Sequence, residues 1–222
     1  MSANRIINIE CSYCHHQQGS EIWDIININD NPELKEKVIN GQIFLNTCEN
    51  CKHQLVYDSP CLYLDPKHEY TIYLQPNYDP KSTKQYNDLM NMLKANSIDL
   101  NLDMRNRLVI NNLRLIEKIQ LFDHGYDDHI MEIYKYLHQG KIIKNYPQTK
   151  NIQAYYVVDQ DLEFIIYVTD NDTYKIKLNK ALYHDIYEDF KAKINNDNSF
   201  AKIDEDWVKE LIKIEYDHQE VK

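Results

Sequence analysis

Cys11-Ser12-Tyr13-Cys14 and Cys48-Glu49-Asn50-Cys51 form two Cys-x-x-Cys pairs near the N-terminus. A two-residue spacer lets both sulfurs of a pair turn toward one point, and two such pairs complete a tetrahedral shell of four thiolates around Zn²⁺. The sequence therefore predicts one structural zinc ion held by Cys11, Cys14, Cys48 and Cys51. Four protein ligands leave no position for water or substrate, so we expect the metal to stabilise the fold and to perform no chemistry.

Residues 15–47 separate the two pairs, a longer gap than the roughly 15–20 residues of compact zinc sites. Local patterns account for this length. Residues 21–29 alternate apolar and polar side chains as a strand does, and residues 31–41 combine an Asn-Pro start, an early Glu and a final Gly, which are helix signals. Residues 42–47 and 54–57 are typical of strands that lead into and out of the second pair. This strand–helix–strand insertion can return the second pair to the first.

The cysteines have three alternative explanations, which are disulfides, unrelated buried thiols or a redox dithiol. The first ten residues lack the apolar core of a signal peptide, so we expect a reducing cytoplasm, where disulfides are disfavoured. A thioredoxin-like dithiol is a single pair ahead of a helix, whereas here two pairs lie among strands. Cys61 lies in an apolar, strand-like run and is expected to be a buried inert thiol, with a fifth ligand or a nucleophile as the alternatives.

Three histidines lie beside the pairs and offer an alternative ligand set. His15 and His16 follow the first pair, and His53 follows the second by two positions. A Cys3His site is conceivable, but four cysteines already fill a tetrahedron. We therefore expect these histidines to flank the turns or to face solvent.

The chain resembles the CpXC-domain proteins, an uncharacterised bacterial family named for its Cys-Pro-x-Cys motifs. The resemblance covers residues 10 to about 75 and continues toward residue 140. Ser12 and Glu49 stand where the family has prolines, which stiffen the turn but are not ligands. The resemblance implies a zinc-ribbon-like domain and brings no established activity. The shared features are Cys11, Cys14, Trp23-Asp24, residues 31–35, residues 41–44, Cys48, Cys51, Tyr63 and residues 121–128.

Composition and charge limit the classes of partner. With 222 residues, 43% of them hydrophobic, the chain can bury the core of one large domain or two small ones. No apolar run approaches the roughly 20 residues that cross a bilayer, so no membrane partner is expected. The net charge is −10, and residues 1–75 and 152–222 are both acidic, which disfavours binding to a phosphate backbone. The basic cluster of the middle segment is expected to be a solvated helix face, with a local nucleic-acid patch as the alternative; it comprises Arg105, Arg107, Arg114 and Lys118.

Residues 77–150 are expected to be mainly helical. Two strands near 62–64 and 70–74 precede this segment, and apolar stripes then predict helices from residue 79, from about 111 to 122 and from 127 to 138. A left-handed helix stop at Gly125 and a following Asp cap explain the turn between the last two helices. Metal binding or acid–base chemistry is the functional alternative for this turn, whose acids and histidines are Asp123, His124, Asp127, Asp128 and His129.

Residues 151–222 are expected to form a second mixed region. Alternating residues predict strands over 152–158, 162–168 and 173–178, which should form an antiparallel meander covered on one face by helices from about 179 to 194 and 204 to 214. Turn chemistry accounts for the aspartates between the strands, because their spacing matches no EF-hand calcium loop; they are Asp159, Asp161, Asp170 and Asp172.

The sequence thus predicts an α+β fold in three parts. Residues 1–76 form a zinc-ribbon β-sheet with a short helical insertion, residues 77–150 a helical segment, and residues 151–222 the meander with its covering helices. The closed metal site and the acidic charge favour a protein-interaction or regulatory module whose partner is a protein. The alternatives are an enzyme of unrecognised type that uses the Asp123-to-His129 turn, and a nucleic-acid-binding zinc ribbon. No phosphate loop, nucleophile elbow or zinc-protease motif is present, so no catalytic residue is assigned.

Overall fold

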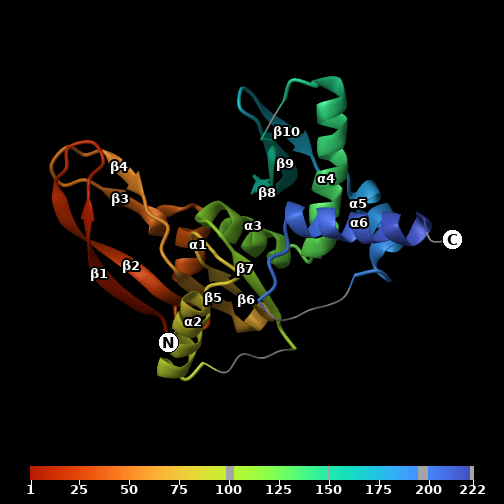
Figure 1. Cartoon of the computed structure of the whole chain (residues 1–222). Helices are drawn as coiled ribbons and strands as arrows, with labels where there is room; N and C mark the ends of the chain where they lie inside the picture. Colours follow the sequence, from red (N-terminus) through yellow and green to blue (C-terminus); the bar gives the residue numbers. More distant parts are fainter. Residues whose placement is uncertain (99–102, 150, 195–199, 221–222) are drawn as a thin grey trace. The chain divides into compact units, whose positions relative to one another are not determined.

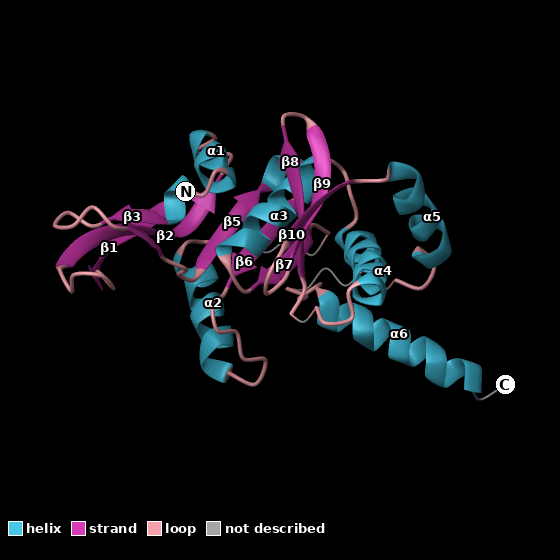
Figure 2. Ribbon diagram, turned by 90° about the horizontal axis from the view of Figure 1, so that it is seen from above, coloured by secondary structure: helices cyan, strands magenta, loops and turns pink. Residues whose placement is uncertain are grey.

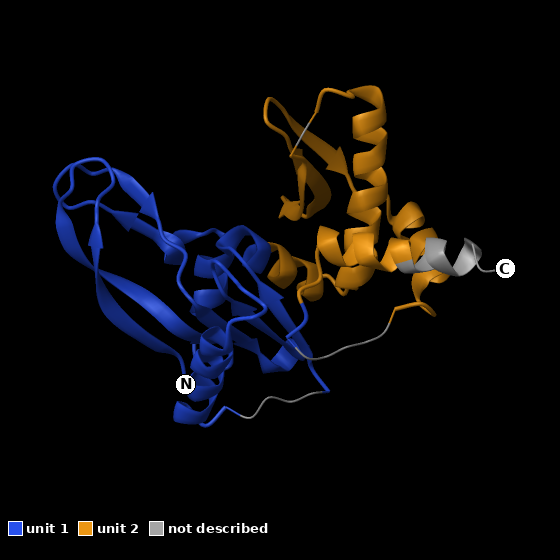
Figure 3. Ribbon diagram, in the orientation of Figure 1, with its two compact units in different colours: residues 1–116, 198–201 blue, residues 117–197, 202–222 orange. Residues whose placement is uncertain are grey.

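A computed structural model of the chain describes residues 1–98, 103–149, 151–194 and 200–220. The chain divides into two compact units, which Figure 3 shows in different colours. The first comprises Met1–Ile116 with Asn198–Ala201, and the second Glu117–Asp197 with Lys202–Lys222. The segment 77–150 contributes elements to both units, and the division of the chain into three domains stays a prediction.

The first unit is built on a five-stranded mixed sheet of order β1-β2-β5-β6-β7 (Figure 1). Pairing is antiparallel within β1–β2 and β5–β6 and parallel within β2–β5 and β6–β7. Every residue of the two central strands, β5 and β6, is buried, as expected for strands covered on both faces. The strands are β1 (Ala3–Glu10), β2 (Gln17–Asn27), β5 (Cys61–Asp65), β6 (Tyr70–Leu74) and β7 (Arg105–Val109).

Helix α2 (Thr83–Ala95) covers one face of this sheet, and α1 (Glu33–Ile39) lies on the other side of it (Figure 2). Leu89 and Leu93 of α2 pack in one core cluster with residues of β2, β5, β6 and β7. The Ser82 hydroxyl accepts a hydrogen bond from the Gln85 N–H at 3.3 Å and so caps the start of α2. The helix expected in this segment is confirmed, but it begins after this cap, at Thr83, and not at residue 79.

Helix α1 is tied to the sheet through Asp65, a carboxylate that is almost completely buried at the end of β5. Lys35 Nζ lies 2.9 Å from Asp65 Oδ2, and His68 Nδ1 lies 2.8 Å from the same oxygen. The short 3-10 helix η2 (Pro66–His68) starts at Asp65, whose side chain accepts the His68 N–H. A buried charge is stable only when it is paired and hydrogen-bonded, and Asp65 meets both conditions.

We expect Asp65→Asn to destabilise the first unit by about 2 kcal/mol at pH 7, because Lys35 would lose its counter-charge. Burial opposes ionisation of Asp65, but the hydrogen bonds from Lys35 and His68 outweigh burial and hold the pKa of this carboxyl below its usual value. A depressed pKa contributes stability that is present above the unfolded-state pKa of about 3.9 and is lost as the pH falls through the folded-state value. Urea unfolding should therefore show a parent–variant difference that shrinks below about pH 4.

The matched control is Asp24→Asn, which breaks a solvent-accessible pair of 2.9 Å with Arg5. Such pairs contribute about 0–1 kcal/mol, so this variant should unfold close to the parent. A loss at Asp65 that is no larger than the loss at Asp24, or that persists undiminished at pH 2, would contradict the assigned role.

A separate two-stranded hairpin, β3 (Leu45–Thr47) with β4 (Gln54–Val56), carries the second cysteine pair. The prediction of a strand over 42–47 is correct only for its second half, since Gln42–Phe44 form the 3-10 helix η1. Gly41 precedes that helix with φ of +72°, a left-handed conformation that ends α1 and reverses the chain.

Strand β7 corrects the expectation that the basic cluster of the middle segment is a solvated helix face. Arg105 and Arg107 lie on a strand paired in parallel with β6, and Arg107 is only 2% exposed. Lys118 is helical as expected but is buried as well. The expectation failed because inner strands and core helices are recognised by the spacing of their apolar residues, and arginine or lysine on a buried face interrupts that spacing.

The second unit combines helices with the predicted antiparallel meander of order β10-β9-β8. Its core gathers apolar residues of α4, the three strands, α5 and α6. The α+β class is therefore confirmed for the chain. The elements are α3 (Asn112–Asp123), whose second half belongs to this unit, α4 (Asp128–Asn145), β8 (Gln153–Asp159), β9 (Leu162–Val168), β10 (Thr173–Lys177), α5 (Lys180–Phe190) and α6 (Glu205–Glu220).

Helices α3 and α4 share a network of buried charges inside the second unit. Lys118 Nζ lies 2.8 Å from Asp128 Oδ2 and 3.6 Å from Glu132 Oε1. Lys135 Nζ lies 2.7 Å from both Glu117 Oε1 and Glu132 Oε1. All five side chains are at most 4% exposed. Such a network holds the two helices in register only while every member keeps its partner.

Candidate metal centre

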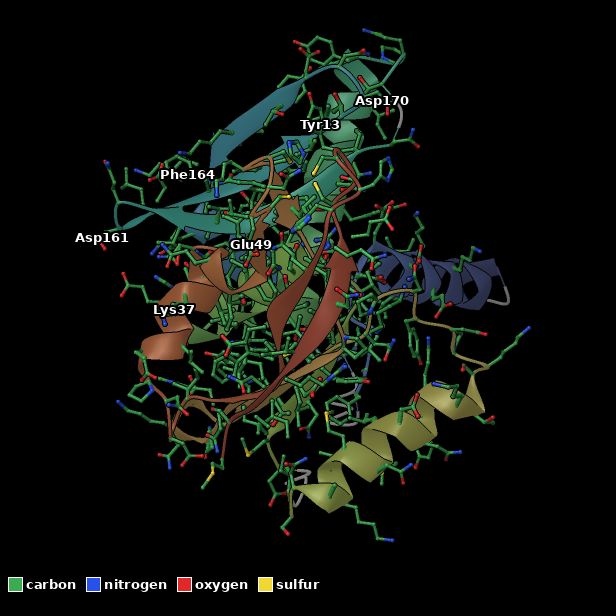
Figure 4. All side chains as sticks on the ribbon, turned by 90° about the vertical axis from the view of Figure 1, so that its left-hand side faces the viewer. Tyr13, Lys37, Glu49, Asp161, Phe164 and Asp170 are labelled. Carbon is green, nitrogen blue, oxygen red and sulfur yellow. The ribbon has the colours of Figure 1, made fainter. Side chains whose placement is uncertain are left out.

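The four cysteines of the Cys-x-x-Cys pairs lie in two hairpin loops of the first unit. Cys11 and Cys14 lie between β1 and β2, and Cys48 and Cys51 lie between β3 and β4. Figure 4 labels Tyr13 and Glu49, one residue from each loop. The four sulfurs all lie within 4.8 Å of one another. The insertion between the pairs thus returns the second pair to the first, as the sequence predicts.

The distances between sulfurs fit a tetrahedral metal site. Cys11 Sγ lies 3.7 Å from Cys51 Sγ, and Cys14 Sγ lies 3.6 Å from Cys48 Sγ. Metal–sulfur bonds of about 2.3 Å at the tetrahedral angle place two sulfurs about 3.8 Å apart. A disulfide requires sulfurs about 2.05 Å apart, so neither of these pairs is a disulfide. The arrangement can hold one metal ion at the centre of four sulfurs.

The two loops share one backbone pattern, although their sequences differ. In the first loop the His15 N–H bonds to the Cys11 carbonyl and the Cys11 N–H bonds to the His16 carbonyl, both at 2.9 Å. Lys52 and His53 make the same two bonds with Cys48, again at 2.9 Å. His15 and Lys52 both adopt positive φ, 57° and 63°. The left-handed residue after the second cysteine reverses the chain, so that both sulfurs of each pair face one point.

The thiols of the cluster differ in acidity. The backbone N–H of His16 lowers the pKa of Cys14 to about 6. The backbone N–H of His53 acts on Cys51 in the same direction, but burial and the three neighbouring thiols outweigh it and raise the pKa of Cys51 to about 12. The first thiolate therefore forms more readily than the next. A bound cation would favour ionisation of all four thiols, since thiolates are the form that binds metal.

A buried glutamine braces the second loop, and our sequence analysis missed it. Gln18 on β2 donates from Nε2 to the Thr47 carbonyl at 3.1 Å and accepts the Glu49 N–H at Oε1 at 2.8 Å. Its side chain thereby fixes the backbone on both sides of Cys48. Extending the strand alternation back from Ile22 would have placed Gln18 on the buried face, but glutamine carries no motif by which to recognise it.

We expect Gln18→Ala to weaken metal binding by about 10- to 100-fold, because groups that orient metal ligands typically contribute that much. Gln17→Ala is the matched control, since the neighbouring side chain is exposed and its hydrogen bonds are to the surface residues Asn8, at 3.4 Å, and Glu10. Competition with a zinc-binding dye measures the affinity of both variants. Equal affinities of the two variants would show that the loop holds its shape without the brace.

The histidines and the fifth cysteine lie outside the group of four sulfurs among the described residues. His15 Nδ1 lies 2.7 Å from Glu10 Oε1 on the surface, and the His53 ring stacks on Tyr13 with centroids 5.4 Å apart. Cys61 is buried in β5, and burial raises the pKa of its thiol well above the usual range. A buried, fully protonated thiol is inert, in agreement with the sequence-based expectation.

Comparison with known proteins gives a family. The family model of the CpXC protein matches residues 9–135. The chain belongs to the CpXC protein family. The match contains all four clustered cysteines and extends to Lys135, so the CpXC region covers the group of four sulfurs that could hold a metal ion and the buried charges of α3 and α4. No curated protein and no solved structure matches the chain. Within the described part of the chain, no helix has the length and apolarity needed to cross a membrane.

The Asp123-to-His129 turn, the alternative site, is explained by its own contacts. Gly125 has φ of +74°, and the Asp127 side chain accepts the His129 N–H at 2.8 Å as the cap of α4. His129 is buried against Trp207 with ring centroids 4.8 Å apart, and Asp128 is paired with Lys118. Asp127, Asp128 and His129 form another group that could hold an ion. Since capping and burial account for these contacts, the catalytic role of the turn stays a prediction.

Proposed function

We propose that the four cysteines bind one structural Zn²⁺ ion that joins the β1–β2 and β3–β4 hairpins. The observation that carries this proposal is the gathering of four sulfurs within 4.8 Å, two pairs of which lie 3.7 and 3.6 Å apart. Zinc is the metal that most commonly occupies a closed set of four thiolates. Cys11 and Cys48 are completely buried, which suits a site that stabilises structure and excludes substrate. A reducing compartment such as the cytoplasm would keep the cysteines reduced, so that the four of the cluster could bind the metal.

On this basis the protein is an interaction module, and its partner is a protein. The hairpins around the metal expose large apolar side chains, of which Ile6 is 78%, Tyr13 73% and Val56 65% exposed. Leu45 lies directly opposite Val56 across the β3–β4 ladder and is also exposed. Large exposed apolar side chains, such as the opposed Leu45 and Val56, are typical of protein-binding surfaces. Because the metal would hold the two loops together, it would also preserve the shape of this surface.

A nucleic-acid partner has less support. The net charge is −10, and Arg107 and Lys118 of the basic cluster are buried, so neither can neutralise a phosphate. Low retention on heparin at low ionic strength is the corresponding expectation. Strong retention that is lost on adding salt would favour the nucleic-acid alternative.

Affinity capture from cells that make the protein tests the interaction proposal. Val56→Lys places a charge among the exposed apolar residues of the β3–β4 hairpin and should abolish capture of the specific partner. Leu162→Lys, at a side chain 48% exposed on β9 of the second unit, is the matched control and should retain it. If the parent and both variants captured the same partner equally well, this hairpin would not be the binding surface.

A further inference from the structure

A cavity of about 590 Å³ lies in the first unit between α2 and the strands β6 and β7. Its volume falls within the roughly 300–1,000 Å³ of small-molecule binding sites. None of the four clustered cysteines lines it, so it is separate from the metal centre and from the proposed protein-binding hairpin.

Aromatic rings form much of the wall of this cavity. Tyr73 of β6 and Phe200 meet edge to face, with centroids 6.1 Å apart and ring planes at 67°. Tyr78 and Tyr86 line the cavity as well and are 36% and 64% exposed, so they stand nearer to solvent. Rings at different angles offer both a face and an edge to an aromatic guest.

A polar corner is buried among these rings. The Tyr73 hydroxyl donates to Gln75 Oε1 at 2.8 Å, and Gln75 Nε2 donates to the Pro76 carbonyl at 2.9 Å. A primary amide has two N–H donors and two acceptor lone pairs, so Gln75 retains one donor and one acceptor beyond these bonds. Gln75 is only 7% exposed. The amide of Asn106, which is 1% exposed, lines the same cavity.

The described lining carries no net charge. Asp79 and Lys81 are its only charged residues, they have opposite signs, and the Lys81 N–H donates to Asp79 Oδ1 at 2.9 Å. Burial raises the pKa of Tyr73 to about 12, so the phenol is neutral at physiological pH. Both charged side chains are exposed, so a charged group placed beside the buried Gln75 would lose its hydration without a buried counter-charge, which is costly.

We propose that this cavity binds a small uncharged aromatic molecule that carries an amide-type edge, such as an aromatic carboxamide or a lactam ring. The aromatic part of the ligand packs among Tyr73, Tyr86 and Phe200. Its amide edge pairs with the remaining donor and acceptor of Gln75, a two-point contact that a purely apolar molecule cannot make. This inference does not depend on the proposed protein-binding role, because it concerns a different surface and a different class of ligand.

Titration of the full ¹⁵N-labelled chain with benzamide, monitored by NMR, tests the site. We expect saturable shifts of the Gln75 side-chain amide and the Leu108 backbone amide, with a millimolar dissociation constant typical of so small a molecule. Tyr86→Ala removes one ring of the wall at an exposed position and should weaken binding at least fivefold. Tyr57→Ala, an exposed tyrosine outside the cavity, is the matched control and should leave binding unchanged.

Two further ligands test the chemical class. Benzoate replaces the neutral amide by a charge, and cyclohexanecarboxamide keeps the amide without the aromatic ring, so both should bind at least fivefold more weakly than benzamide. Gln75→Met should remove most of the advantage of benzamide over toluene. Absence of saturable shifts, equal binding by the Tyr86→Ala and Tyr57→Ala variants, or a preference for benzoate would each overturn the proposal.

Discussion

The Cys48→Ser variant is expected to lose its bound zinc and to unfold at a much lower temperature than the parent. Serine replaces a thiolate by a hydroxyl that does not ionise at neutral pH, and three remaining sulfurs cannot close the tetrahedron. Structural zinc binding contributes about 10–16 kcal/mol in isolated zinc-finger peptides, so the loss of even part of it exceeds the effect of most single substitutions. Zinc content by mass spectrometry and thermal unfolding by circular dichroism measure both effects.

Cys61→Ala is the matched control, because it removes a buried thiol outside the group of four sulfurs. We expect it to retain about one zinc per chain and to lose only about 1–2 kcal/mol of stability from the small cavity in β5. The thiols would prove to be free if the parent protein, purified under reducing conditions, contained no metal, or if the Cys48→Ser variant were as stable as the parent. Redox chemistry at the two pairs would then become the leading interpretation.

The second large effect is expected at Lys118. Lys118→Met leaves Asp128 without its partner at 2.8 Å inside the second unit, where Asp128 is completely buried. Removing one partner of a buried ion pair typically costs about 3–5 kcal/mol, and here the buried carboxylate would lose its nearest cation and keep only weaker contacts such as His129 Nδ1 at 3.6 Å. Lys118 also donates to the Ile203 carbonyl at 3.0 Å, and this bond is lost too. Chemical denaturation of the parent and the variant gives the difference in the free energy of unfolding.

Lys141→Met tests whether the effect belongs to the buried network. Lys141 lies on the exposed side of α4, so replacing it should change stability by less than about 0.5 kcal/mol. The double variant Lys118→Met with Asp128→Asn should recover part of the loss, because it removes the buried negative charge as well as its lysine partner. A Lys118→Met variant that is as stable as the Lys141→Met variant would mean that water reaches this network.

The metal centre and the meander illustrate what local sequence can reveal. Metal-binding motifs are defined by residue type and spacing, so two Cys-x-x-Cys pairs indicate a four-sulfur site before any fold is known. Turn residues and strand alternation are equally local, and they located β8, β9 and β10 correctly. Strand β1 was missed, because its exposed Ile6 and buried Ile9 obscure the two-residue alternation.

The roles of the buried polar residues depend on partners that are distant in the chain. Arg107, Lys118 and Gln18 have the hydropathy of surface residues, so a pattern of apolar positions assigns them to solvent. They are buried because carboxylates and backbone groups from other elements compensate the cost of removing them from water, as Asp128 does for Lys118 and Thr47 does for Gln18. Spacing alone was enough to predict that the four cysteines lie together. The brace beside them, the buried charges and the cavity beneath α2 became visible only once the chain was folded, since each depends on contacts between residues far apart in sequence.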